Sequence, residues 1–394
     1  MNTLKEKIKS LSQELQSQWI NYRRHLHAHP ELSFQEWETS KFIQTKLAEE
    51  GISFTTGWAK TGISAMVYGK NPESRRFSLR GDMDALPIFE KNNIEYISQN
   101  PGIMHACGHD VHTTCALGAA IVLHRLKEEW EGTVQIIFQP GEEILPGGAN
   151  EMIKAGIFND FTPCGIIGQH VYPELPAGKV GFKPGWYMAS TDEIYIKVNG
   201  KGGHGAKPEK CIDPILIASH LVVALQQVAS RWTHSNDTSV LTIGKFVGMG
   251  ATNIIPDFVI LEGTFRTFNE IWRYEAHEKI KNLCEHICVS MGGSAEVEIK
   301  IGYPALFNDP ELTVRSKELA IEYLGAENVI DLNQRTTAED FAYFAQQYPG
   351  CFYRLGTASP DGACSAPVHN SEFNIDENAL VIGVGLMAFL ATQR

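Results

Sequence analysis

The stretch Met104-His105-Ala106-Cys107-Gly108-His109-Asp110-Val111-His112 places a thiol, three imidazoles and a carboxylate within nine residues. A hydrophobic core offers such groups few partners, and a buried polar group without a partner is costly. A metal ion gives several of them one common partner. The stretch therefore predicts a metal site, and we expect the fold to be built around it.

Two residues of this stretch are the main ligand candidates. Cys107 and His109 are separated by one glycine, so in an extended or turning segment both side chains can point the same way. We expect His105 and His112 to support the site or to contact the start of the following helix. The remaining ligands must come from distant segments. Candidates that follow apolar strands or stand near the C-terminus are Glu142, Glu143, His170 and His369.

Glu142 and Glu143 form an adjacent carboxylate pair after an apolar strand. A solvated loop is one interpretation, because neighbouring carboxylates repel each other. The other interpretation gives them two roles: one binds a cation, and the other stays uncoordinated and takes a proton from the attacking water. Asp82 and Asp84 also follow a strand, and each is either a ligand or a carboxylate that orients a ligand histidine.

The composition is that of a soluble globular protein. The chain has 394 residues, of which 43% are hydrophobic and 20% are charged, and its length indicates two domains. A net charge of −12 argues against nucleic acid or an anionic membrane as the main partner. A small anionic substrate would still need a local basic anchor.

The sequence predicts a cytoplasmic location. The chain is charged from its first residues, shows no apolar leader segment, and has no apolar run of transmembrane length. Its eight cysteines are scattered, without the density of a disulfide scaffold. In a reducing cytoplasm Cys107 would stay free to bind metal.

Hydrophobic periodicity predicts an α/β fold for most of the chain. Helical patterns cover residues 4–28, 35–50, 113–126 and 377–390, and strands are predicted at 63–68, 77–80, 133–138 and 165–168. The last three strands each deliver polar residues where they end, which is where open α/β sheets place their ligands.

A different pattern runs through the middle of the chain. Strand, helix, strand, strand, helix and strand are predicted in turn at 194–198, 213–231, 240–247, 258–268, 271–291 and 295–301. This order is that of a ferredoxin-like two-layer unit. We therefore expect one discontinuous domain, residues 1–187 and 302–394, interrupted by a smaller inserted domain at residues 188–301.

Taken together, these residues resemble a known family. The chain is similar to the aminoacylase, hippurate hydrolase and auxin-conjugate (IAA-amino acid) hydrolase amidohydrolases, a dinuclear branch of the metallopeptidases. The matching motifs span almost the whole chain: Arg24 to Ser33, Arg80 to Pro87, Met104 to His112, Gln139 to Glu143, Gly203 to Ala206, Ala338 to Phe341 and Val368 to Asn370. The resemblance implies a mixed-sheet, zinc-peptidase-like catalytic domain with an inserted ferredoxin-like lid or dimerisation domain.

The resemblance also implies roles for individual residues. The implied metal ligands are Cys107, His109, Glu143, His170 and His369. Glu142 is the implied general base, and Asp84 falls where the family has a carboxylate that buttresses a ligand histidine. His204 matches a lid histidine which, in relatives, reaches the active site of the other subunit of a dimer and stabilises the oxyanion. Asn253 and Arg266 fall near positions associated with substrate contact, although a turn former and a solvated strand residue are their alternatives.

Two departures from the family pattern bear on substrate preference rather than on the reaction. Lys207-Pro208-Glu209 stands where many members have a histidine after the proline. Arg335-Thr336-Thr337, before the Ala338-Glu339-Asp340 motif, is more polar than usual.

Two divalent metal ions are the implied cofactors. Five protein ligands are few for two ions that need about four contacts each, so we expect the Cys107 sulfur and a hydroxide to bridge them. A thiolate with three imidazoles suits zinc, cobalt or nickel, and family members are also described with manganese. Zinc is our first expectation.

The predicted function is metal-dependent hydrolysis of N-acyl amino acids, such as acetyl or benzoyl conjugates, to a carboxylic acid and an amino acid. Deacetylation of N-acetyl-diaminopimelate and dipeptide hydrolysis share this chemistry and stay open as alternatives. A non-catalytic metal- or ligand-binding relative is an alternative of another class, but it would not need Glu142. A purely structural dimerisation protein leaves the polar cluster unexplained. We expect a homodimer formed through the inserted domain.

Overall fold

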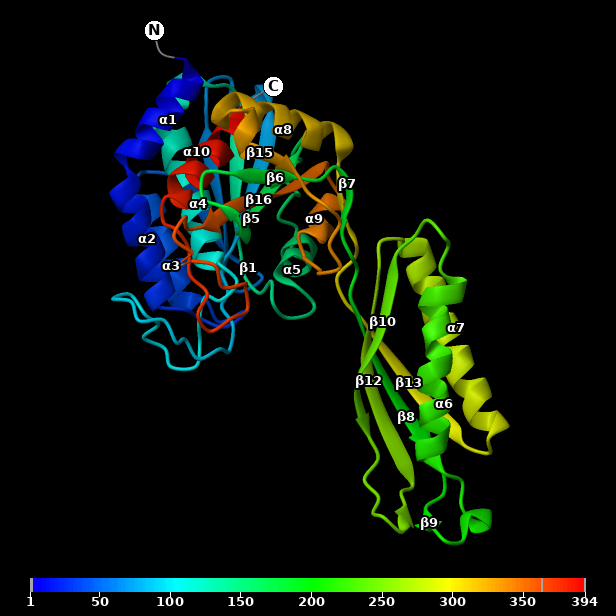
Figure 1. Ribbon diagram of the computed structural model, residues 1–394. Coiled ribbons are helices and arrows are strands. Elements are labelled where there is room, and N and C mark those ends of the chain that lie inside the picture. Colours follow the sequence, from blue (N-terminus) through cyan, green and yellow to red (C-terminus); the bar gives the residue numbers. More distant parts are fainter. Residues whose placement is uncertain (1–2, 363, 393–394) are drawn as a thin grey trace. The chain divides into compact units, whose positions relative to one another are not determined.

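The computed structural model describes residues 3–362 and 364–392. The chain forms two compact units (Figure 1). The first unit contains residues 1–185, 307–333 and 340–394, and the second contains residues 186–306 and 334–339. Each unit has a hydrophobic core of its own.

The first unit is built on a mixed sheet of eight strands in the order β1-β2-β4-β3-β5-β16-β6-β15. These strands are β1 (Ser53–Trp58), β2 (Gly62–Tyr68), β3 (Arg76–Asp82), β4 (Thr133–Gln139), β5 (Ile166–Pro176), β6 (Val180–Phe182), β15 (Val329–Asp331) and β16 (Gly350–Ala358). Strand β3 runs parallel to β4 and β5, and β16 runs parallel to β5, whereas β2 is antiparallel to β4. Every residue of β4 is buried, as expected for a strand that is covered on both faces.

Helix α4 (His109–Arg125) is the central helix of the first unit. It packs against α10 (Ala379–Thr392) and α2 (Gln16–Ala28), and all its residues from 109 to 123 are buried. Gly118 allows the close approach of α10, because a Cβ at this position would lie 2.5 Å from a methyl group of Val384. The other helices of this unit are α1 (Leu4–Glu14), α3 (Trp37–Glu49), α5 (Gly148–Lys154), α8 (Pro310–Leu324) and α9 (Ala342–Ala345).

The start of α4 differs from the prediction. The helix begins at His109 and not at position 113, and its N-cap is Gly108, whose φ of 81° lies in the left-handed region. Glycine adopts this conformation readily, but a positive φ leaves no trace in a hydrophobic pattern. As a result, His109 stands in the first turn of the helix, and Cys107 lies directly before the turn.

The second unit has the predicted ferredoxin-like order of elements. They are β8 (Asp192–Asn199), α6 (Pro214–Gln227), β10 (Ser239–Val247), β12 (Phe258–Thr267), α7 (Glu270–Ser290) and β13 (Ser294–Ile301). The strands form an antiparallel sheet in the order β10-β12-β8-β13, with α6 and α7 on one face (Figure 1). Asp213 caps α6 by accepting hydrogen bonds from the backbone N–H groups of Ile215 and Leu216. The α/β fold class, with an inserted ferredoxin-like unit, is confirmed.

A small ribbon and a short distant segment complete the second unit. Strands β9 (Gly203–His204) and β11 (Ile254–Ile255) pair with each other. Residues 334–339, which we expected in the catalytic domain, group with the second unit. Their backbone pairs with an earlier segment, because Arg335 N–H donates to the Tyr187 carbonyl at 2.9 Å and Ala189 N–H donates to the Arg335 carbonyl at 3.1 Å. Strands β7 (Gly185–Met188) and β14 (Leu306–Asn308) lie where the chain passes between the units.

None of the helices within the described residues is both long enough and apolar enough to cross a bilayer.

Candidate metal centre

Strand ends bring many of the predicted site residues together in the first unit. Strands β3 and β4 are parallel and end at the same edge of the sheet, at Asp82 and Gln139. Asp84 follows β3, and the turn that carries residues 142–143 follows β4. His170 differs from the prediction, because it lies inside β5, which continues past it to Pro176.

Donor atoms of the five predicted ligands fall into two overlapping groups. Those of Cys107, His109 and His170 all lie within 4.8 Å of one another. Those of Cys107, Glu143 and His369 do so as well. The Cys107 Sγ is 3.4 Å from His170 Nε2, and His369 Nε2 is 3.3 Å from Glu143 Oε1. Cys107 therefore belongs to both groups.

Two imidazoles direct their Nε2 atoms toward this cluster. His109 Nδ1 donates to Asp84 Oδ1 at 3.2 Å, and His170 Nδ1 donates to the Val171 carbonyl at 2.8 Å. In both rings Nδ1 is occupied by this bond, so Nε2 is the nitrogen that would bind a cation. Among the described residues, His109 Nε2 is a buried atom without a hydrogen-bond partner, and Glu143 Oε1 is a buried atom whose ion-pair contact is with His369. A cation is the partner that such atoms fit, since buried polar atoms rarely stay unpaired.

The electrostatics of the cluster also fit a cation. Burial raises the pKa of the Cys107 thiol well above its ordinary value, and the charge of Glu143 raises it further. Burial opposes protonation of His109, but the neighbouring carboxylates, led by Asp82 and Asp84, outweigh it and raise the pKa of the imidazole to about 10. Both groups thus hold protons in a field of carboxylates. A divalent cation would neutralise that field and displace those protons.

Asp84 is buried beneath the cluster and accepts hydrogen bonds from several segments. Its Oδ1 accepts from the backbone N–H of Glu142 at 3.0 Å, in addition to the His109 bond. Its Oδ2 accepts from the backbone N–H of Glu143 at 3.0 Å and from Ser33 Oγ at 2.6 Å. These bonds outweigh the effect of burial and lower the pKa of Asp84, so that it stays ionised.

Glu142 is a nearly buried carboxylate at the edge of the cluster. Its side chain carries an oxygen within 4.8 Å of donor atoms of His109 and Glu143, and the residue is 7% exposed. A carboxylate in this position can accept a proton from a water molecule that the other donors help to hold.

His112 is held by protein atoms on both sides of its ring. Its Nδ1 donates to Asp82 Oδ1 at 2.6 Å, and its Nε2 accepts the backbone N–H of Val171 at 2.9 Å. Asp82 is paired in turn with Arg80 at 2.6 Å. His112 and Asp82 are therefore fixed by protein contacts, and they support the cluster without being predicted ligands. His105 is also buried, and burial lowers its pKa to about 4.

His369 joins the cluster from the C-terminal part of the chain. Its φ of 64° is unusual for a residue other than glycine, and strained backbone of this kind concentrates at functional sites. Its backbone N–H donates to the Ala106 carbonyl at 2.7 Å, which ties it to the stretch that carries Cys107. The side chain is 53% exposed, so it forms the solvent-facing side of the cluster.

The other three predicted site residues belong to the second unit. His204 is exposed on β9, and its Nδ1 accepts the Ala206 N–H at 3.1 Å, which leaves Nε2–H as a donor to solvent. Asn253 is exposed in the turn before β11, where its carbonyl accepts the Gly205 N–H at 2.8 Å. Arg266 lies on β12 and donates to the Thr336 carbonyl at 3.0 Å.

The motif at residues 24–33 supports the site indirectly. On the same helix, Arg23 is buried and pairs with Asp110 at 2.8 Å, and His27 Nδ1 lies 2.8 Å from the same carboxylate. This pairing ties α2 to the first turn of α4. The motif ends at Ser33, which bonds Asp84. Glu36, three positions later, also reaches the site, and sequence reasoning missed it because a single glutamate at the start of a helix carries no signal.

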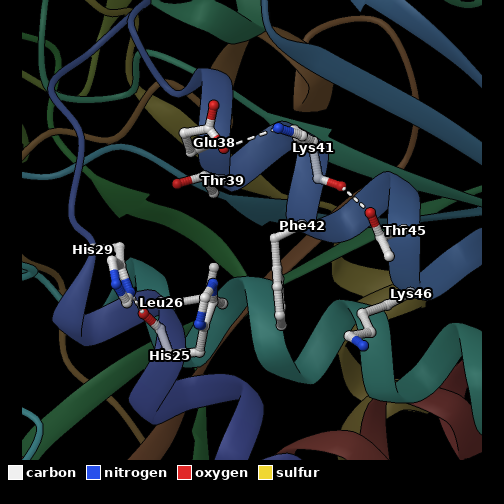
Figure 2. A pocket seen from close by; sticks show the side chains of 9 residues that line it. All are labelled: His25, Leu26, His29, Glu38, Thr39, Lys41, Phe42, Thr45 and Lys46. Atoms are coloured by element: carbon white, nitrogen blue, oxygen red, sulfur yellow. Dashed lines mark hydrogen bonds and ion pairs between the residues drawn. The ribbon is translucent and has the colours of Figure 1, made fainter.

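A surface pocket of about 440 Å³ lies between α2 and α3 (Figure 2). Within it the His25 ring stacks on Phe42, with ring centroids 4.3 Å apart, and His29 Nδ1 donates to the His25 carbonyl. Lys46 also lines the pocket. All its lining residues are described, and none of them is a predicted site residue.

The first unit thus carries Cys, His and Glu donor atoms close together, with the buried carboxylate of Glu142 beside them, at one end of a mixed sheet. The model of peptidase family M20/M25/M40 matches residues 78–393, which is well over half of the chain. The chain belongs to this family.

Several relatives are similar in sequence over almost the whole length of this chain. An N-acetyl-L-cysteine deacetylase of Bacillus subtilis strain 168 is 39% identical over 380 residues, which are 96% of this chain and 89% of the relative. IAA-amino acid hydrolase ILR1-like 4 of Arabidopsis thaliana is 37% identical over 379 residues, 95% of this chain and 85% of that protein. The crystal structure of Bacillus subtilis YXEP, described as a dinuclear metal binding peptidase from the M20 family, is similar with a TM-score of 0.83 and 35% identity, over 96% of this chain and 98% of that one.

Proposed function

We propose that this M20-family chain is a metal-dependent amidohydrolase that cleaves N-acyl amino acids into a carboxylic acid and a free amino acid. The observation that carries the proposal is the buried Glu142 carboxylate, which lies within 4.8 Å of donor atoms in a cluster of metal-binding type. A protein that only binds a metal or a ligand does not need such a carboxylate. The names of the relatives above, a deacetylase and an amino acid conjugate hydrolase, support amide bonds at an amino acid nitrogen as the target.

The proposed ligands divide between two divalent metal ions. Cys107, His109 and His170 would hold one ion, and Glu143 and His369 would hold the other with the Cys107 thiolate shared between them. The dinuclear description of the Bacillus subtilis relative supports this number. Zinc fits the soft sulfur and imidazole donors best, with manganese, cobalt and nickel as alternatives.

Bound divalent ions would polarise the amide carbonyl and lower the pKa of a coordinated water to about 7. Glu142 would take a proton from the attacking water as the water oxygen bonds to the amide carbon. It would then give that proton to the amide nitrogen as the C–N bond breaks, so that the products are a carboxylic acid and a free amine. Asp84 keeps the Nε2 atom of His109 directed at the cluster, because it fixes Nδ1 at 3.2 Å.

Three residues of the second unit are proposed to act on the substrate. His204 would stabilise the oxyanion through its Nε2–H, in the active site of the partner subunit of a homodimer. Arg266 and Asn253 would contact the substrate, and the guanidinium supplies the basic anchor that an anionic amino acid product requires. Departures at residues 207–209 and 335–337 would tune the preference for particular substrates.

The reaction is tested with purified protein, loaded with zinc or manganese, on a panel of amides. The panel contains N-acetyl, N-benzoyl and indole-acetyl amino acids with free and blocked α-carboxylates, together with N-acetyl-diaminopimelate and dipeptides. We expect metal-dependent turnover of the N-acyl amino acids that weakens when the carboxylate is blocked. Glu142→Gln should lower kcat by roughly 10²–10⁴-fold with unchanged metal content. Full activity of this variant would remove the role of Glu142, and no turnover across the panel would revive a binding function.

The homodimer and the cytoplasmic location are further parts of the proposal. In the antiparallel sheet of the second unit, β10 and β13 are the edge strands, and an edge strand offers pairing to another chain. Val223 on α6 is 74% exposed, so the second unit also presents an apolar side chain to solvent. Light scattering of the purified protein tests the dimer.

All eight cysteines are free, which supports a reducing compartment, and fractionation of the source cells tests that location.

A further inference from the structure

A short segment before α3 lies against both turns that shape the metal centre. The backbone N–H of Ala85 donates to the Glu31 carbonyl at 2.8 Å, and Leu32 forms a bridge with Ala85. Ser33 Oγ donates to Asp84 at 2.6 Å. The segment is thus fixed to the turn after β3, close to the carboxylate on which the site rests.

Glu36 connects the same segment to the turn after β4. The residue is fully buried, and its Oε1 accepts the Gly141 N–H at 2.9 Å and the Phe34 N–H at 2.8 Å. Its Oε2 accepts the Thr61 hydroxyl at 2.6 Å. The carboxylate of Glu36 therefore joins its own segment, the residue before β2 and the turn that carries Glu142.

Three consecutive backbone N–H groups of that turn end on buried carboxylates. Gly141 donates to Glu36, whereas Glu142 and Glu143 donate to the two oxygens of Asp84 at 3.0 Å each. Because the backbone of this turn is fixed at three successive positions, the side chains of residues 142 and 143 each leave it in a fixed direction. Such fixing by supporting hydrogen bonds is what catalytic geometry requires.

The turn also fits the segment by shape. Gly141 has a φ of 61°, and a Cβ at this position would lie 2.5 Å from the ring of Phe34. Phe34 itself has a φ of 61°. Two residues in the left-handed region thus face each other where Glu36 makes its bond, and the contact is specific to this arrangement.

We propose that Glu36 is a positioning residue for the reaction: through the Gly141 N–H it holds the turn that aims Glu142. The inference rests on the proposed role of Glu142 as general base. Burial and the neighbouring charge of Asp84 raise the pKa of Glu36 to about 7, so the group is costly to keep in place. Ionisable groups that a fold retains in spite of such a cost concentrate at functional sites.

The test compares three variants of the metal-loaded full chain. Glu36→Ala removes the acceptor of the Gly141 N–H, and we expect kcat to fall by about 10–100-fold with unchanged KM and metal content. Glu36→Gln keeps an oxygen for that N–H, and its amide can donate to Thr61, so it should restore kcat to within a few-fold of the wild type. Ser40→Ala is the matched control. It removes a buried hydrogen bond to the Thr61 carbonyl without touching the turn, and it should leave kcat unchanged.

A second measurement needs no turnover. Hydrogen exchange, followed by mass spectrometry on peptides that cover residues 139–145, should show about tenfold faster exchange in Glu36→Ala but not in Glu36→Gln or Ser40→Ala. A wild type without amidohydrolase activity would refute the proposed function, and the exchange result would still decide whether Glu36 holds the turn.

Two outcomes would overturn the inference. One is a Glu36→Ala protein with wild-type kcat or wild-type exchange of the turn. The other is a loss of activity in proportion to lost metal, because Glu36 would then act on the ligands. Should Glu36→Ala fail to accumulate, Glu36→Asp serves in its place. It keeps the charge but shortens the reach, and a wild-type kcat in that variant would equally refute the role.

Discussion

Asp84 accepts hydrogen bonds from Ser33, from the His109 ring and from the backbone of residues 142 and 143. An asparagine at this position has one acceptor oxygen, and its amide group would face an N–H donor. We therefore expect Asp84→Asn to weaken metal affinity by roughly 10–100-fold, the usual effect of losing a carboxylate that orients a ligand histidine, because His109 is a proposed ligand. Competition with a chromophoric chelator measures the affinity. Ser33→Ala, which loses one of these bonds, should have a smaller effect, and equal affinity of Asp84→Asn and wild type would contradict the orienting role.

Glu36 gives the fold a pH dependence whose sign follows from its pKa. Burial and the charge of Asp84 raise this pKa from 4.5 to about 7, so the folded chain keeps a proton that the unfolded chain loses between these values. Stability therefore falls as the pH rises through this range. We expect Glu36→Gln to remove this loss and to be more stable than the wild type at pH 8, by on the order of 2–3 kcal/mol. Urea unfolding of the metal-free proteins at pH 5, 6 and 8 measures the difference, and parallel pH profiles would count against the raised pKa.

At the scale of elements, the N-terminus of α4 places Cys107 and His109. Gly108 has a φ of 81°, and a Cβ there would lie 2.5 Å from a methyl group of Val171 on β5. Gly178 is the matched control, since its φ is 94° but a Cβ would meet nothing within 4 Å. We expect Gly178→Ala to cost about 1–2 kcal/mol for the left-handed backbone alone. Gly108→Ala should cost about 1–3 kcal/mol more through the clash and should also lose metal. Chemical unfolding measures the loss of stability in each variant, and metal analysis measures the loss of metal. Equal losses of stability in the two variants would show that the space between Gly108 and Val171 can take a Cβ without a clash.

Long, strongly periodic elements could be predicted from the sequence, and short or distant ones could not. The ferredoxin-like order could be predicted because hydrophobic residues recur with a period of about two in its strands and about 3.6 in its helices. Strand β6 has three residues and shows no pattern of its own. His170 was expected after a strand, but β5 continues because its neighbours β3 and β16 supply pairing partners that no local pattern reports.

Those parts of the candidate site that have unusual residue types at close spacing could be predicted from the sequence. Cys107, His109 and the pair at residues 142–143 stand out by residue type and spacing, and the structure brings their donor atoms within 4.8 Å in overlapping groups. The supporting contacts could not be predicted. Glu36 reaches Gly141 across 105 positions of sequence, and such a tertiary contact leaves no signal in either segment.

The two units of the chain carry different parts of the proposed chemistry. The donor atoms of the cluster all belong to the first unit, whereas His204, Asn253 and Arg266 belong to the second. The first unit has a core that includes α4, β4 and α10 and needs no residue of the second. Metal binding and substrate handling should therefore separate when the inserted unit is removed.

The two ends of the insertion are close enough to test this separation directly. Thr191 N–H donates to the Tyr303 carbonyl at 3.0 Å, so an Asn-Gly turn can join these residues in place of 192–302. We expect the shortened chain to fold and to bind metal with the stoichiometry of the full chain, because all the donors remain. Amide hydrolysis should fall by roughly 10²–10³-fold or more, since the proposed oxyanion donor His204 is lost. Metal analysis, circular dichroism and the N-acyl amino acid assay measure the three properties. His204→Ala in the full chain provides the matched control, and it should reproduce most of the kinetic loss with the insertion present. A shortened chain that folds without metal would show that the second unit completes the centre, and one that keeps its activity would remove His204 and Arg266 from the reaction.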